Sequence, residues 1–209
     1  MGFIGGGSNP AMGSGSAGLI GVINEGVIQA PTYDTLIIDP DWNRGVLNSG
    51  TVEAVAGGYL QLQGGLNSSS ALCPVDNTSG FILASGSSNV VGYRRDSEVE
   101  ISSVDLTGGT IAASNSGIVV FDGSSIIQNA AVTLSGSNSQ ALAGQASSIF
   151  GVPPPPDVTF NNVSFSGDGS AGQALHVATY GSFSYAGGGN HFTNLNNVSF
   201  LNGLTTYFS

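Results

Sequence analysis

The sequence predicts an all-β chain built from stacked coils of short strands. Short apolar runs alternate with clusters of Gly, Pro, Asn and Asp, which is typical of strands and turns. Helical spacing over 11 or more residues is hard to find, and only residues 19–29 are ambiguous. One sequence template also recurs about every 30 residues, which is typical of a solenoid. An irregular antiparallel β-sandwich is the alternative fold.

Composition excludes several functions. The chain has 209 residues with 40% hydrophobic side chains, enough to bury a core, but only 8% are charged. Three arginines (Arg44, Arg94 and Arg95) stand against 13 Asp and Glu, lysine is absent, and the net charge is −10. Nucleic acids and anionic membranes both require clusters of cations. We therefore expect neither as a partner.

Residues 1–30 predict an apolar anchoring arm. Gly and Ser dominate residues 1–18 and allow backbone freedom, yet residues 1–30 hold too many apolar side chains for a solvated linker. Such a segment becomes ordered by burying these side chains against a partner. We expect the partner-binding residues to be Phe3, Ile4, Leu19, Ile20, Val22 and Ile23. Deleting residues 2–18 should leave the coils folded but abolish attachment.

Residues 31–97 predict an irregular region of short strands, and residues 98–209 predict the coils themselves. Runs such as 35–38 and 59–62 are apolar and bounded by turn residues. Four later segments share one template, an extended run, two small residues, then Val, any residue, and Leu or Phe. They are EVEISSVDLTG (98–108), SIIQNAAVTLSG (125–136), DVTFNNVSFSG (157–167) and HFTNLNNVSFLNG (191–203).

The two small residues of this template predict a corner between two strands. Val99 and Ile101 alternate inward before the corner, and Val104 and Leu106 do so after it, a change of parity that requires a bend. Stacking the coils would place four valines in one inward column: Val104, Val132, Val163 and Val198. The same stacking lets Asn161 and Asn196 form an amide ladder. This is the pattern of a parallel β-helix.

The NNVSF pattern at residues 161–165 and 196–200 resembles right-handed parallel β-helix proteins. It is closest in character to bacteriophage tailspike-like and head-decoration proteins. The resemblance implies a structural virion protein, a capsid decoration (cement) or short spike protein attached to the major capsid protein or another virion protein. Two alternatives remain: an adhesin or receptor-binding tailspike fragment that binds glycans through aromatics such as Tyr180, Phe183 and Tyr185, and a polysaccharide depolymerase.

Two further features bear on location and assembly. No cation precedes Arg44 and no early apolar run has signal-peptide length, which favours assembly in the host cytoplasm and a place on the virion surface. Residues 203–209 are apolar and aromatic, with no polar segment to close a solenoid end. A closed oligomer would cover that end, and we expect a homotrimer. Pro153–Pro156 predict a stiff excursion between coils.

Candidate chemistry is sparse, and we expect no enzyme activity, cofactor or metal. Glu98 and Glu100 share one strand face roughly 7 Å apart, a separation that inverting glycosidases use, but we favour a solvated face or a subunit ion pair. GSGSAG at 13–18 matches a dinucleotide-binding pattern without the preceding strand. Residues 39–43 open like a calcium loop that then fails at Arg44. Cys73 and two histidines lack metal-site spacing.

Overall fold

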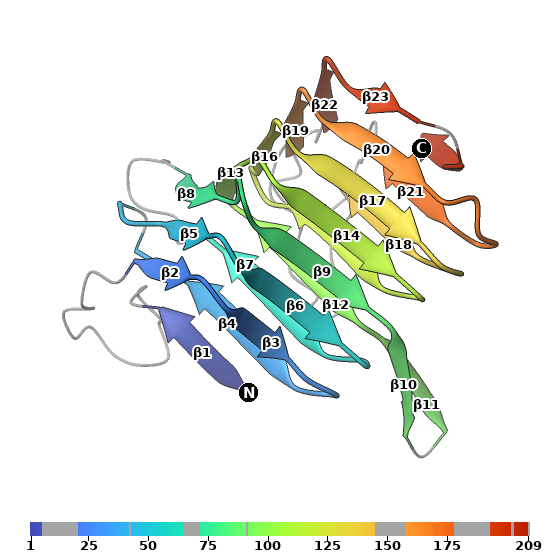
Figure 1. Cartoon of the computed structure of the whole chain (residues 1–209), viewed down its shortest axis with the longest axis horizontal. Helices are drawn as coiled ribbons and strands as arrows, with labels where there is room; N and C mark the ends of the chain where they lie inside the picture. Colours follow the sequence, from blue (N-terminus) through green and yellow to red (C-terminus); the bar gives the residue numbers. More distant parts are fainter. Residues whose placement is uncertain are drawn as a thin grey trace, which may run out of the picture.

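A computed structural model describes residues 1–5, 21–41, 43–64, 72–90, 92–144, 158–177, 193–201 and 203–208. Every regular element in these residues is a strand, and three long sheets contain only parallel neighbours. We call these sheets A, B and C, in the order in which the chain enters them. The chain passes through them in this repeating order, so each coil contributes one strand to each sheet (Figure 1). The protein is therefore a right-handed parallel β-helix, as its sequence predicts.

The strands of each sheet follow one another along the solenoid axis. Sheet A contains β1 (Gly2–Gly5), β4 (Thr35–Asp39), β7 (Tyr59–Gln63), β12 (Glu98–Ser102), β15 (Ile118–Asp122), β18 (Gln140–Ala143), β21 (Ala174–Val177) and β24 (Thr206–Phe208). Sheet B contains β2 (Val22–Asn24), β5 (Val46–Asn48), β8 (Cys73–Asp76), β13 (Val104–Thr107), β16 (Ile126–Gln128), β19 (Val158–Asn161) and β22 (Thr193–Asn196). Sheet C contains β3 (Val27–Ala30), β6 (Thr51–Val55), β9 (Phe81–Ser85), β14 (Thr110–Ser114), β17 (Ala131–Ser135), β20 (Ser164–Gly167) and β23 (Ser199–Phe200).

Alternation along each strand builds the core, because every second side chain points into the solenoid. Parallel register stacks these inward side chains into columns along the axis. One column on sheet A is fully buried and runs Leu60, Val99, Val119, Ala141, Leu175. Burial of each such aliphatic side chain contributes roughly 1.5 to 3 kcal/mol relative to exposure.

The corner between sheets B and C carries an asparagine column. In the first three coils the side chains of Asn24, Asn48 and Asn77 are buried. Asn24 Nδ2 donates to Asn48 Oδ1 (2.7 Å), and Asn48 Nδ2 donates to Asn77 Oδ1 (2.7 Å). A Cβ at Gly80 would overlap the Asn48 and Asn77 amides, so glycine is required there. These interior amides are thereby satisfied by one another.

The last three coils continue the column on the outside of the corner. Asn129, Asn162 and Asn197 have positive φ angles of 53°, 54° and 53°, and their side chains are exposed. Asn162 Nδ2 donates to Asn129 Oδ1 (2.8 Å), and Asn197 Nδ2 donates to Asn162 Oδ1 (2.9 Å). The predicted contact between Asn196 and Asn161 is confirmed, with a donor–acceptor distance of 2.8 Å.

The predicted alignment of the four valines is wrong. Val104 begins β13 on sheet B, whereas Val132 lies in β17 on sheet C, so the first segment is one sheet out of phase. Val132 is the register partner of Phe165 and not of Val163. The second segment is therefore shifted by two residues relative to the predicted alignment. Three of the valines are buried and Val198 packs against the core. The error arose because Ser103 turns the A–B corner with a φ of 57°, as asparagines turn the B–C corner.

The sheets run without a break across both of the expected boundaries, at residues 30/31 and 97/98. Strands β1, β2 and β3 form the first coil, and β4 to β9 form the next two. The glycine-rich composition of the first 30 residues hid this coil, because its strands are only three or four residues long. The described part of the predicted arm is therefore part of the solenoid.

The loop after β20 is organised by Asp168. Its carboxylate accepts hydrogen bonds from the backbone N–H of Gly136 (2.9 Å) and Ser170 (2.9 Å), and these lower the pKa of Asp168 to about 2. Because this pKa lies below the unfolded value of about 3.9, the stabilisation is present above about pH 4 and is lost as pH falls toward 2.

We expect Asp168→Asn to lower the melting temperature near neutral pH and to match the wild type near pH 2. Melting curves of both proteins between pH 2 and pH 6 test this. A difference that stays constant across this range would show that the Asp168 charge has no part in the effect.

Candidate functional site

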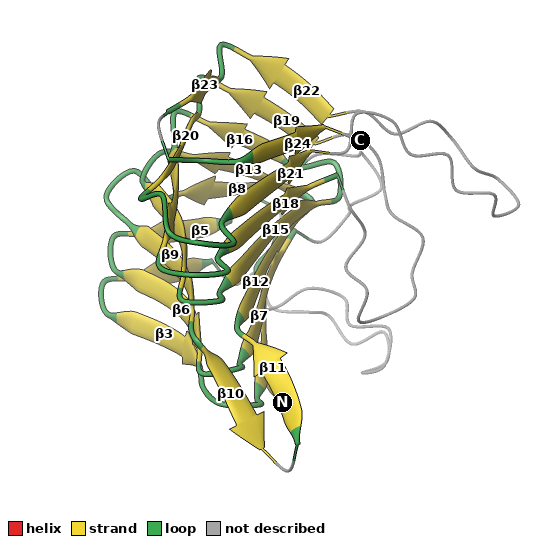
Figure 2. Cartoon of the chain, turned by 90° about the vertical axis from the view of Figure 1, so that its right-hand side faces the viewer, coloured by secondary structure: helices red, strands yellow, loops and turns green. Residues whose placement is uncertain are grey.

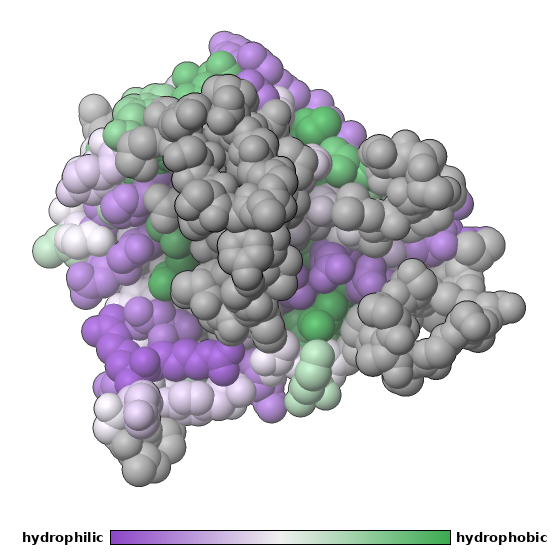
Figure 3. Space-filling model, turned by 180° about the vertical axis from the view of Figure 1, so that it is seen from behind, coloured by the Kyte–Doolittle hydropathy of each residue, from purple (hydrophilic) through white to green (hydrophobic). Residues whose placement is uncertain are grey.

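The C-terminal end of the solenoid exposes a group of apolar side chains, which we call the terminal patch. It comprises Leu195, Phe200, Leu201, Tyr207 and Phe208, whose exposed fractions lie between 36% and 55%. Hydrophobic atoms at this end form the green area at the upper left of Figure 3. No side chain of the patch is charged. An exposed apolar surface of this kind is typical of a contact with another macromolecule.

Three side chains of the terminal patch form the last layer of the core. Inward columns of the three sheets end in Phe208 on sheet A, Leu195 on sheet B and Phe200 on sheet C. Beneath them every equivalent side chain of the preceding coil is buried, namely Val177, Phe160 and Phe165. The backbone edges of β22, β23 and β24 are also the last in their sheets.

A chain of aromatic contacts supports the patch from below. Phe121 contacts Phe160, and Phe160 contacts Phe165, both edge to face with ring centroids 5.2 Å apart. Phe165 then stacks on Phe200 at 5.7 Å, and Phe200 meets Phe208 at 6.0 Å. Such pairs contribute about 0.5 to 1.5 kcal/mol beyond area burial. The exposed rings are therefore held in place by the buried ones.

The structure distributes the predicted partner-binding residues differently from the sequence expectation. Val22 is buried and Ile4 packs partly against the core, so both serve the first coil. Phe3 lies on β1, with its Cα opposite Ile37. Leu19 and Ile20 lie outside the described residues. Ile23 is 72% exposed and is the register partner of Leu47, also exposed.

Ile23 and Leu47 are neighbours on the outer face of sheet B, and exposed Val27 lies on sheet C of the first coil. The described chain thus has apolar surface near both ends.

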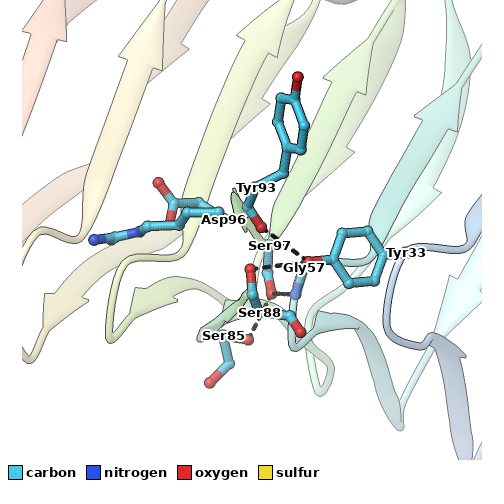
Figure 4. Close-up of polar contacts among 8 residues, drawn as sticks. Tyr33, Gly57, Ser85, Ser88, Tyr93, Asp96 and Ser97 are labelled. Carbon is cyan, nitrogen blue, oxygen red and sulfur yellow. Dashed lines mark hydrogen bonds and ion pairs between the residues drawn. The ribbon is translucent and has the colours of Figure 1, made fainter. Parts of the chain in front are cut away.

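A β-hairpin leaves the solenoid between the third and fourth coils. It pairs β10 (Ser87–Val90) with β11 (Tyr93–Asp96) in antiparallel fashion and projects from the C–A corner (Figures 1 and 2). The Tyr33 hydroxyl lies 3.1 Å from the carbonyl oxygen of Ser88 and 3.3 Å from that of Tyr93, and these two acceptors share its single proton (Figure 4). The Tyr93 ring points away from these contacts and is 80% exposed.

Hydrogen bonds through Ser97 fix the hairpin base. Its hydroxyl donates to the Ser85 carbonyl (2.7 Å) and accepts from the Gly57 N–H (2.9 Å). Arg94 pairs with Asp96 at 2.8 Å on the hairpin surface. Two-stranded hairpins are marginal in water by themselves. These contacts therefore hold the hairpin in one orientation.

We expect Tyr33→Phe to speed amide hydrogen exchange across residues 87–96 at least fivefold while leaving the main coils unchanged. Removal of the hydroxyl removes the one donor that the Ser88 and Tyr93 carbonyl oxygens share, whereas the ring stays. Exchange measured residue by residue tests this, and Tyr93→Phe is the matched control because the Tyr93 ring is exposed and points away from the hairpin base. Unchanged exchange in Tyr33→Phe would mean that the base contacts alone fix the hairpin.

The predicted carboxylate pair is not an open acidic face. Glu98 and Glu100 do share the outer face of sheet A, but Glu100 is only 5% exposed. The Tyr59 hydroxyl donates to Glu100, and Gln61 Nε2 donates to its other oxygen at 2.9 Å. Burial raises the pKa of Tyr59 above its ordinary value, and the Glu100 charge raises it further. The phenol therefore stays protonated as a donor.

Each of the other candidate groups has its own local environment. Burial raises the pKa of the Cys73 thiol to about 12, with smaller effects from Asp39 and Asp41, so the thiol is a poor nucleophile at neutral pH. Asp39 is buried, and burial raises its pKa as well. Asp41 accepts the Asn43 N–H in a local turn. His176 stacks on Tyr207, with centroids 4.9 Å apart.

Several sequence predictions fall outside the described residues: the GSGSAG stretch, the four prolines, one of the two histidines (His191), and the aromatics Tyr180, Phe183 and Tyr185. Within the described ranges, no three His, Cys, Asp or Glu side chains gather as a metal site would require. The same ranges contain no helix long and apolar enough to cross a membrane.

Comparisons with protein-family models, with curated proteins and with solved structures find no match to this chain. The assignment of the β-helix therefore rests on the strand order and register of the chain itself.

Proposed function

We propose that the chain is a non-enzymatic structural component of a virion, a bacteriophage decoration or short spike protein that assembles as a homotrimer. The observation that carries the proposal is the terminal patch, in which three exposed apolar side chains lie directly above buried ones of the preceding coil. Open solenoid ends require a cap for solubility. A second and third copy of the same chain supply that cap when the three ends meet.

Charge favours a meeting of copies at this end. Each copy carries a net charge of −10, which opposes association through most surfaces. The terminal patch is uncharged and aromatic, so it is where copies approach at the lowest electrostatic cost. A head-to-tail contact would propagate into a filament, whereas a closed ring covers the patch of every copy.

Attachment to the major capsid protein or another virion protein is assigned to the opposite end. Of the predicted partner residues, Ile23 is exposed there beside Leu47. Because the patches lie at different ends, assembly and attachment can be tested separately.

Sedimentation equilibrium at micromolar concentration tests the assembly. The wild type is expected to have three times the chain mass. The double variant Phe200→Ser, Phe208→Ser is expected to be monomeric, because it removes the two exposed rings that end columns on sheets C and A. Tyr93→Ser, which removes an exposed ring from the hairpin, is the matched control and should stay trimeric.

A stable wild-type monomer would refute the assembly proposal. A double variant that remains trimeric would place the interface elsewhere. For attachment, Ile23→Ser with Leu47→Ser should reduce occupancy on particles without changing the oligomer mass. Localisation of the wild type at a tail tip bound to a glycan would overturn the proposed shell or spike role.

A further inference from the structure

The hairpin of β10 and β11 is a long insertion at a corner that the solenoid turns elsewhere with few residues. Residues 56–58 suffice to join β6 to β7, and residues 115–117 suffice to join β14 to β15. Residues 86–97 separate β9 from β12, yet both strands stay paired with the coils on either side. The fold therefore does not require the hairpin, which projects from the coils in Figures 1 and 2.

The two preceding C–A corners hold the hairpin in place. Tyr33 has a φ of 60°, an unfavourable conformation for a bulky side chain, and its hydroxyl reaches the hairpin backbone. A Cβ at Gly57 would lie only 2.9 Å from the Arg95 carbonyl oxygen, so glycine is needed for this close approach. Backbone strain that is kept for a contact of this kind points to a functional element. A fixed orientation also lowers the entropy lost on binding a partner.

The hairpin presents the side chains that most often dominate protein–protein binding, Tyr and Arg. The Tyr93 ring is 80% exposed and points away from the hairpin base (Figure 4). The Arg94 side chain is half exposed, and its partner Asp96 is one-third exposed. Ion pairs this accessible to water are weak, so Arg94 can pair with a carboxylate of another protein instead.

Charge distinguishes the hairpin from the rest of the chain. It holds two of the three arginines and a single acidic residue, Asp96, which gives residues 87–96 a net charge of +1. The total charge is −10, so all other residues together carry −11. The hairpin is therefore the part of the chain that an acidic surface can approach most favourably.

The number of cations favours a protein as the partner. Nucleic acids and anionic membranes are bound through clusters of Lys and Arg, and the −11 on the remaining residues repels such polyanions. A second copy of this chain is disfavoured because both copies carry −10. Another protein can present a small acidic patch, beside an apolar site for a tyrosine ring, without a large overall negative charge.

We propose that the hairpin is a docking element for an acidic patch on a different protein, with Tyr93 as the anchor and Arg94 and Arg95 as the partners of its carboxylates. The proposal does not rest on the virion role or on the homotrimer. An extended segment of the partner can also add a strand, because within the described residues β10 and β11 pair only with each other.

The test uses the full chain and a random library of 12-residue peptides displayed on yeast. Peptides are selected on the wild type and depleted on the triple variant Tyr93→Ser, Arg94→Ser, Arg95→Ser. The peptides that depend on the hairpin are expected to hold at least two Asp or Glu and an apolar residue. Their affinity should fall at least tenfold between about 50 mM and about 500 mM NaCl, because salt screens exposed charges.

Single variants assign the contributions, with the best peptide as the probe. Tyr93→Ser and Arg94→Ser should each weaken binding at least fivefold. Arg44→Ser is the matched control, because it removes the third arginine, which is also exposed but lies between β4 and β5. It changes the net charge by the same amount and should leave the affinity within twofold of the wild type. Thermal unfolding establishes that the solenoid is intact in each variant.

The proposal is overturned if no library peptide depends on the hairpin, or if the dependent peptides lack acidic residues. It is also overturned if Arg44→Ser weakens binding as much as Arg94→Ser, since overall charge would then explain the effect. A DNA duplex of 20 base pairs that binds the hairpin as tightly as the best peptide would replace the protein partner by a nucleic acid. A lower oligomer mass in the triple variant would make the hairpin a contact between copies of this chain.

Discussion

Replacing Phe160 with alanine is expected to lower the free energy of unfolding by about 3 to 5 kcal/mol. The ring is fully buried and contacts Phe121 and Phe165 edge to face, each at 5.2 Å. Stacked strands on both sides hold the surrounding side chains in register, so the cavity can collapse only partly. Urea unfolding followed by circular dichroism measures the loss.

Phe81→Ala is the matched control for Phe160→Ala. Phe81 lies on the outer face of sheet C and is 36% exposed, so its truncation opens no interior cavity. We expect a loss of less than about 1.5 kcal/mol. Similar losses at the two positions would contradict the placement of Phe160 in the core.

Replacing Asn48 with alanine is expected to cost about 2 to 6 kcal/mol. The substitution leaves two buried groups without their ladder partner, the Nδ2 donor of Asn24 and the Oδ1 acceptor of Asn77. Each buried polar group that loses its partner costs about 1 to 3 kcal/mol. The same urea titration measures the effect.

The exposed part of the asparagine column, which comprises Asn129, Asn162 and Asn197, provides the control for Asn48→Ala. Asn162→Gly breaks the same kind of hydrogen bonds, but Asn129 and Asn197 are exposed and water replaces the lost amide. We expect a loss below about 1 kcal/mol. Equal losses at Asn48 and Asn162 would mean that the buried asparagines of the column stabilise the fold no more than the exposed ones.

Local sequence patterns were sufficient to predict the architecture. Alternation of apolar residues predicted which side chains of β12 face inward, and Val99 and Ile101 do so. The recurring NNVSF pattern predicted both stacked corners and the bond between Asn196 and Asn161. Residues 203–209 were noted as apolar and aromatic, and Tyr207 and Phe208 are exposed.

The sequence could have predicted only in part the buried asparagines of the column and the contacts that Tyr33 makes with the hairpin. Asn24, Asn48 and Asn77 recur at spacings close to one coil, but their flanking residues share no template with NNVSF. The contacts of Tyr33 with the hairpin join residues 55 and 60 positions apart. Nothing in the local sequence around Tyr33 indicates those contacts.

The sequence by itself determined the all-β class, the inward pattern and the apolar character of residues 203–209, because each depends on residues close together in the chain. Only the tertiary structure decided the phase of the repeat, the use of Ile4 and Val22 in the first coil, and the burial of Glu100 beside Tyr59. These depend on which strand each segment stacks against. A corner looks the same in sequence whether it joins sheet A to B or B to C, so only the stacking of whole coils distinguishes the two.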